Sequence, residues 1–201
     1  MSLNTFLLSV FAVTLALMNG YEFRFAVFVM SYAFMQLIEY LIWSHGLSNK
    51  KTNKILSFAG AMLLLLQPLA AILLLDDSPV RRGLLAAYAV FIVLHFLSSN
   101  SSDFRTTVAK NGHLHWHFMT PGVYSLTFCI YMALLLIPFV ILTKYHPILY
   151  FGLATLIFSI ATFAQSQTWG SMWCWMLNFL SVMIIIRIVF WEHFVKWCTK
   201  N

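Results

Sequence analysis

Glu39 is an acidic residue inside a long apolar stretch of the sequence. A charged side chain at the centre of a bilayer costs about 2.5–3.5 kcal/mol on insertion scales, so such residues usually have a partner or a function. Gln36 and Trp43 lie about one helical turn before and after Glu39, so the three side chains share one helix face. A buried carboxyl of this kind can carry a proton or bind a cationic ligand. The alternative is a structural pairing with another polar side chain of the bundle, such as His95 or Gln67.

Other strongly polar and aromatic side chains fall at a similar depth if consecutive helices alternate in direction. Most of them occur near those ends of the apolar segments that would face the same side as the N-terminus. We therefore expect a cavity open to that side, with Glu39 at its floor and aromatic side chains at its rim. Ordinary helix packing and an interfacial belt of tryptophans are the alternatives. The expected ligand or ion pathway comprises Gln36, Glu39, Trp43, Gln67, His95, Trp173, Trp175 and Asn178.

Three histidines alternate along the longest loop, at His113, His115 and His117. In an extended segment alternate side chains point to the same side, and imidazole is a ligand for zinc, copper, nickel and iron. The three residues are therefore candidates for a metal site, shared with His95 or Glu39. Their spacing differs from the i, i+4 histidine pair of the common zinc-hydrolase motif. A loop anchored at the membrane interface by aromatic and histidine side chains is the alternative.

The composition points to a membrane protein. The chain has 201 residues, of which 61% are hydrophobic and only 9% are charged, too few charges for a soluble domain of this length. A membrane-spanning helix needs about 20 apolar residues. Seven windows meet or approach this length, at about 3–20, 24–46, 54–75, 83–98, 122–142, 147–165 and 170–191.

These windows predict an all-α fold, a polytopic membrane helix bundle of seven transmembrane helices that forms one domain over residues 1–201. Six helices preceded by a cleaved signal peptide is the alternative. The first window lacks the basic N-terminal region and the small-residue cleavage site of a signal peptide, which favours a retained helix.

The formal net charge of +6 indicates a positive-inside bias rather than a nucleic-acid surface, because no cluster of Lys and Arg exceeds three residues. With seven crossings, five basic residues fall on the N-terminal side and seven on the other, out of twelve in all. This predicts a non-cytoplasmic N-terminus and a cytoplasmic C-terminus. The three cysteines Cys129, Cys174 and Cys198 lie in or beside the windows and indicate no disulfide framework.

Several short motifs occur together in this chain. They are Gln36-x-x-Glu39, Gln67-Pro68, a His/Trp segment around Trp116, and Gly170-Ser171-Met172-Trp173-Cys174-Trp175. In this combination the chain resembles a family of small, uncharacterised multi-pass membrane proteins found in bacteria and in large DNA viruses of algae and protists. The resemblance implies a membrane bundle with polar residues at these positions, and it implies no particular reaction.

Three classes of function follow from these features. The leading expectation is a small transporter, channel or ligand-binding protein that needs no cofactor and whose partners are the lipid bilayer and a small molecule or ion. An integral-membrane metal enzyme would instead use the histidines as ligands and Glu39 as acid or base. A purely structural membrane protein is the third class. A retinal protein is excluded, because the last window contains no lysine for a Schiff base.

Overall fold

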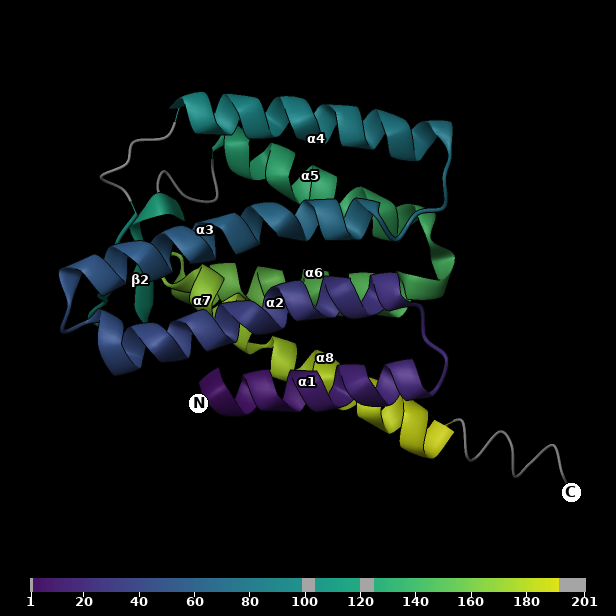
Figure 1. The fold of residues 1–201 in the computed structure, drawn as a ribbon, viewed down its shortest axis with the longest axis horizontal. Coiled ribbons are helices and arrows are strands. Elements are labelled where there is room, and N and C mark those ends of the chain that lie inside the picture. The colour runs from purple at the N-terminus through teal and green to yellow at the C-terminus, as the bar shows by residue number, and fades with distance from the viewer. Residues whose placement is uncertain (1, 99–103, 120–124, 192–201) are drawn as a thin grey trace, which may run out of the picture.

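The computed structural model describes residues 2–98, 104–119 and 125–191. Most of these residues form helices that run back and forth along one long axis (Figure 1). The helices are α1 (Ser2–Met18), α2 (Phe23–Leu41), α3 (Lys50–Ile72), α4 (Pro79–Ser98), α5 (Leu126–Ile141), α6 (His146–Phe163), α7 (Trp169–Trp175) and α8 (Leu177–Ile186). Two π-helical turns, Ile42–Gly46 and Arg187–Trp191, continue α2 and α8.

Local sequence signals set several helix ends. The Asn49 side chain accepts hydrogen bonds from the backbone N–H groups of Lys51 and Thr52, and so caps the start of α3. Ser125 caps α5 in the same way through the N–H of Phe128. Ser78 accepts a hydrogen bond from the N–H of Arg81 at the start of α4. The starts of these three helices therefore follow from side chains that satisfy free backbone N–H groups.

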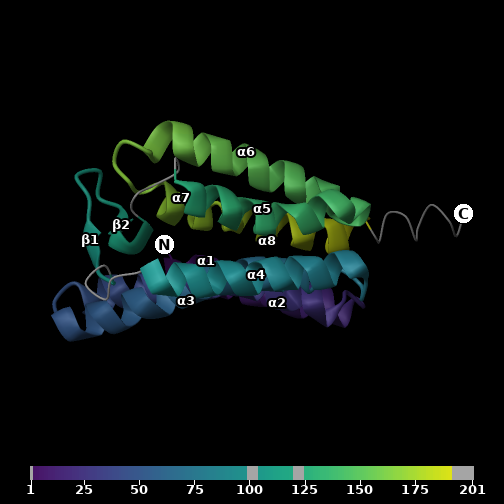
Figure 2. The ribbon, with the colours of Figure 1, turned by 90° about the horizontal axis from the view of Figure 1, so that it is seen from above.

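The helices form two layers (Figure 2). The first four helices lie side by side as an antiparallel layer, and α5, α6, α7 and α8 pack against one face of it. α3 and α4 contact α5, and α1 contacts α8, so each edge of the first layer meets the second layer. Alternation places the starts of α1, α3 and α7 at the same end of the bundle as the ends of α2 and α6. We call this end, where the chain begins, the N-terminal end.

The prediction of a mostly helical fold is confirmed, and each apolar window coincides with a helical segment. Five segments are long and apolar enough to cross a membrane: Phe23–Gly46, Lys50–Ile72, Pro79–Ser98, Thr143–Phe163 and Trp169–Phe190. This is consistent with an integral membrane protein. α1 and α5 are apolar but shorter, with 17 and 16 residues. The window predicted at 170–191 is helical, but Met176 interrupts it and divides it into α7 and α8.

α1 packs into the bundle through a narrow face of small side chains. Ala12, Val13 and Ala16 are buried against α2 and α8. The hydroxyl groups of Ser9 and Ser181 form a buried hydrogen bond of 2.9 Å between α1 and α8. Small and weakly polar residues allow close approach of helices in an apolar environment, where dispersion and hydrogen bonds drive association.

A short antiparallel hairpin covers the N-terminal end of the bundle. Its strands are β1 (Thr106–Val108) and β2 (Leu114–Trp116), with Thr107 opposite His115. The sequence predicts only a loop here. Three-residue strands are marginal by themselves, so other contacts must hold the hairpin in place.

Side chains attach the hairpin on both sides. The Asn53 amide on α3 donates to the carbonyl oxygen of Thr106 and accepts from its N–H, both at 2.9 Å. On the other side, the Asn111 amide in the hairpin turn donates to the hydroxyls of Ser166 and Thr168, at 2.9 and 2.8 Å. The hairpin is therefore fixed between α3 and the link from α6 to α7.

Trp116 joins the hairpin to α3 by direct packing on a glycine. The indole is 2% exposed and its six-membered ring lies directly against Gly60. A Cβ atom at position 60 would lie 2.7 Å from Cζ3 of Trp116 and 3.0 Å from Cη2. Only glycine leaves room for the ring at this point on α3.

We expect Gly60→Ala to lower the stability of the folded protein by about 1–3 kcal/mol, because the buried ring cannot move away from the added methyl group without disturbing its neighbours. Thermal unfolding in detergent, followed by circular dichroism, measures the change.

The matched control is Gly83→Ala on α4, where an added Cβ meets no atom within 4 Å. This variant should unfold at the wild-type temperature or slightly above it. Equal melting temperatures for the two variants would contradict the packing of Trp116 on Gly60.

Candidate functional site

Glu39 lies on the last regular turn of α2 and is 3% exposed. Its Oε2 accepts two long hydrogen bonds of 3.4 Å, from the Gln36 amide one turn earlier and from the Ser2 hydroxyl at the start of α1. Its Oε1 has no hydrogen-bond partner among the described residues. The carboxyl is thus buried and only weakly held, and one of its oxygens is buried without a donor.

The π-helical turn Ile42–Gly46 begins three residues after Glu39. A π turn contains one more residue per turn than an α-helix and often occurs at functional sites. Ile42 is fully buried, whereas Trp43 is 43% exposed at the rim of a cavity beside Glu39. The turn therefore lies where α2 passes from the buried core to the open end of the bundle.

Trp116 and Ser171 are further neighbours of the carboxyl. Both side chains lie next to Glu39. The Trp116 indole N–H is buried beside it without a well-directed hydrogen bond to any described atom. Cys174, one turn after Ser171, is also buried and near Glu39. The packing of Trp116 on Gly60 thus also positions one neighbour of the Glu39 carboxyl.

A half-open cavity of about 500 Å³ extends from Glu39 towards the hairpin. Four elements contribute to its lining: the start of α1, the end of α2, the hairpin turn and α7. The lining residues are Ser2, Glu39, Tyr40, Trp43, Gly112, His113, Leu114, Ser171, Met172 and Trp175. We call this cavity the Glu39 pocket.

Four residues singled out from the sequence line the Glu39 pocket: Glu39, Trp43, His113 and Trp175. Glu39 therefore lies at the same end of the bundle as the indoles of Trp43 and Trp175, as expected from the sequence. Gln36 is fully buried behind the carboxyl and touches it through its amide. Ser2 and Tyr40 line the pocket without having been expected there, because their placement depends on how α1 packs beside α2.

Other expected site residues lie elsewhere. Gln67 is fully buried and accepts a hydrogen bond of 2.7 Å from the hydroxyl of Tyr131, so it does not pair with Glu39. His95 stacks against Phe91 of its own helix, with ring centroids 5.9 Å apart. Asn178 belongs to α8, but its side chain lies outside the part of the chain that the structure describes.

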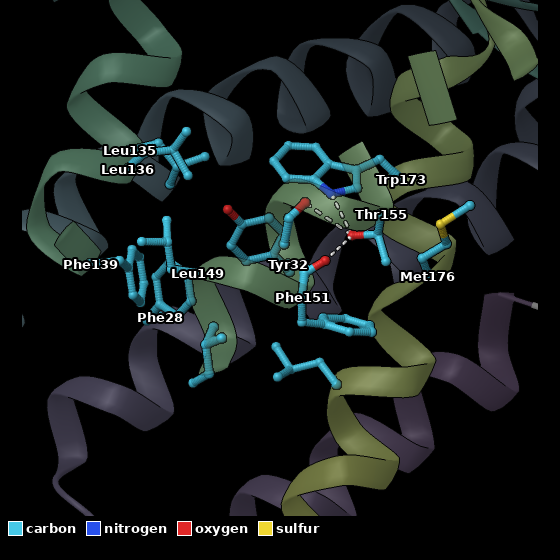
Figure 3. Close-up of a pocket in the computed structure, with 13 residues that line it drawn as sticks. Phe28, Tyr32, Leu135, Leu136, Phe139, Leu149, Phe151, Thr155, Trp173 and Met176 are labelled. Carbon is cyan, nitrogen blue, oxygen red and sulfur yellow. Dashed lines mark hydrogen bonds between the residues drawn. The ribbon is translucent and has the colours of Figure 1, made fainter. Parts of the chain in front are cut away.

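Trp173 lines a second, smaller cavity, although it is only two residues from Trp175 (Figure 3). Its indole N–H donates to the hydroxyl of Thr155 at 3.2 Å. This cavity has a volume of about 50 Å³ and an almost entirely apolar lining that includes Phe28, Tyr32 and Met176. Successive residues of a helix are about 100° apart, so Trp173 and Trp175 face different sides of α7.

The three loop histidines do not lie in the same environment. His113 lines the Glu39 pocket and meets Phe163 edge to face, with ring centroids 5.8 Å apart. The rings of His115 and His117 are 4.3 Å apart, and Nε2 of His117 forms a hydrogen bond of 3.0 Å with the Thr107 hydroxyl. Among the described residues, no three His, Cys, Asp or Glu side chains converge as a metal site would require. Metal binding by these histidines stays a prediction.

The arrangement suits binding more directly than bond-making chemistry. A carboxyl that is buried, weakly hydrogen-bonded and open to a cavity can accept a donor from a ligand at low desolvation cost, because most of its hydration is already lost. The indoles of Trp43 and Trp175 supply apolar and π surface around it.

We expect His115 to be neutral at pH 7. Burial and the nearby positive charge of Arg105 lower the pKa of this imidazole below its usual value. Arg105→Gln should therefore raise the pKa of His115, because the repulsion is removed. The exposed Lys110 lies on the same hairpin, and Lys110→Gln should leave that pKa unchanged. Titration of the imidazole signals by NMR, assigned with a His115→Gln variant, measures both; an unchanged pKa in Arg105→Gln would contradict the prediction.

Comparison with known proteins adds no relative to this picture: no family model, no curated protein and no solved structure matches the chain. The family resemblance suggested by the short motifs therefore remains an expectation.

Proposed function

We propose that the chain is an integral membrane protein with seven crossings. It binds a small molecule or ion in the Glu39 pocket and acts either as a receptor or as a small transporter. The observation that carries the proposal is the buried Glu39 carboxyl, which has one unpartnered oxygen and lines a cavity of about 500 Å³. Ligand sites in proteins have volumes of about 300–1,000 Å³ and a few polar groups in a mostly apolar lining.

Seven crossings are supported by the way the two short helices pack. A helix rises about 1.5 Å per residue, so 16 or 17 residues extend about 24–26 Å, close to a hydrocarbon core about 30 Å thick. α1 lies beside α2 and α8, and α5 lies beside α3, over most of their lengths (Figure 1). An apolar helix in such a position shares the environment of the longer helices next to it.

The crossing number is tested with single exposed cysteines in a background whose three native cysteines are replaced by alanine. With seven crossings, a membrane-impermeant thiol reagent should label Asn4→Cys and Lys110→Cys from one side. The same reagent should label Asp77→Cys and Thr143→Cys from the other side. Labelling of Thr143→Cys from the side of Lys110→Cys would mean that α5 does not cross, and labelling of Asn4→Cys with Asp77→Cys would mean the same for α1.

Access to the Glu39 pocket is tested in the same background with Ser171→Cys, which keeps the size of the side chain. We expect labelling only from the side that labels Lys110→Cys, because the cavity opens beside the hairpin. Ser181→Cys is the control, since Ser181 is fully buried between α8 and α1 and should not react from either side. Labelling of Ser171→Cys from the side of Asp77→Cys would contradict a cavity open to the N-terminal end.

A further inference from the structure

Glu39 differs from the other acidic residues that the structure describes. Glu22 pairs with Lys144, Asp76 with Arg24, and Asp77 with Arg82. These three ion pairs lie at the end of the bundle opposite the Glu39 pocket, where α1 and α2 are joined and α3 leads into α4. Of the four described acidic side chains, only Glu39 has no basic partner, and it is also the most deeply buried.

The surroundings of Glu39 do not neutralise it. Its two hydrogen bonds come from neutral groups, the Gln36 amide and the Ser2 hydroxyl, and both are long. Among the described residues no lysine or arginine lines the pocket, and His113 is the one basic side chain there. A carboxyl in such a position favours an incoming positive charge or a hydrogen-bond donor.

The rest of the lining selects the kind of cation. A hard metal ion such as Ca²⁺ takes six to eight oxygen ligands, whereas Glu39 is the only carboxylate that lines this pocket in the described part of the chain. The lining instead supplies the indoles of Trp43 and Trp175 and the apolar side chains of Leu114 and Met172. Indole faces attract ammonium groups, and recognition of quaternary ammonium by aromatic side chains is a common use of this attraction.

Resting on the function proposed above, we propose that the Glu39 pocket binds an organic cation of the alkylammonium class. The charged nitrogen lies beside the Glu39 carboxylate at the wall of the pocket, and the alkyl groups around it lie against Trp43 and Trp175. The ammonium group can belong to a soluble molecule or to the headgroup of a phospholipid, because the pocket lies at an end of the bundle where lipid headgroups would be close.

The test compares three probes of nearly equal shape on purified protein in phosphatidylglycerol nanodiscs: choline, its neutral carbon analogue 3,3-dimethylbutan-1-ol, and the anion 3,3-dimethylbutanoate. Saturation-transfer NMR on the equivalent methyl protons measures binding of each probe. We expect choline to bind about tenfold or more tightly than the neutral analogue, and the anion not to bind.

Two substitutions should remove this preference. Glu39→Gln keeps the shape of the side chain and should make choline and the neutral analogue bind alike. Trp43→Leu, at the exposed rim, should weaken choline binding severalfold without affecting the fold. The matched controls are Asp76→Asn, which removes an acidic group at the far end, and Trp173→Leu, which changes an indole of the other cavity. Both should bind choline as the wild type does.

A second arm separates the two sources of the ammonium group. In phosphatidylcholine nanodiscs a headgroup that occupies the pocket competes with choline, so the ratio of wild-type to Glu39→Gln affinity should fall towards one. An unchanged ratio assigns the pocket to soluble cations. The ratio is used because the surface potential of the lipid acts equally on both proteins.

The outcomes distinguish this inference from the proposed function. If the neutral probe binds as well as choline and binding is lost in Ser171→Trp, the pocket is a ligand site but not a cation site. If no probe binds the wild-type protein in either lipid and Ser171→Cys is labelled from neither side, both proposals are wrong. Cation preference that survives Glu39→Gln also overturns the inference, because the charge would then be recognised elsewhere.

Discussion

The pairing of the Asn53 amide with the backbone of Thr106 is the interaction on which the N-terminal end of the bundle depends. It satisfies both the N–H and the C=O of one strand residue at 2.9 Å, as a neighbouring strand would do. Buried backbone groups must find such partners. Ser57, one turn further along α3, adds a buried hydrogen bond of 2.8 Å to the Thr106 hydroxyl. These contacts hold a hairpin that is too short to be stable alone, and the hairpin in turn carries Trp116 to the wall beside Glu39.

Charge is distributed unequally along the long axis of the molecule. One end holds three exposed or half-exposed ion pairs, whose members are close to water and largely screened. At the other end, the acidic side chain that the structure describes is the buried carboxyl of Glu39, next to neutral and aromatic groups. A lone buried carboxyl weakens a helix bundle unless its cost is offset, and the ligand binding proposed above would supply such an offset.

Much of the architecture could be predicted from the sequence because long apolar runs leave few alternatives to helices. The alternation of those helices also explains why Glu39, Trp43 and Trp175 lie at one end. The faces of the helices were harder to predict. Gln67 is turned towards Tyr131, and Trp173 belongs to a separate cavity, since helix rotation depends on side-chain packing with neighbours far away in the sequence.

The hairpin has one signal in the sequence, the Asn111-Gly112 pair of its turn, where Gly112 has a φ of 77°. The helix break has no such signal. The pairing of β1 with β2 depends on Asn53 and Asn111, whose partners lie 53 and more than 50 residues away. No glycine or proline marks the interruption at Met176, which separates α7 from α8. Ser2 could not be assigned to the site either, because its contact with Glu39 arises only when α1 and α2 are packed together.

One short helix, α7, borders both cavities of the bundle. This seven-residue helix is the partition between two chambers: Ser171, Met172 and Trp175 face the larger one, and Trp173 faces the smaller one. The two cavities therefore have one thin wall in common, and residues of the same short segment shape both of them without sharing a lining side chain.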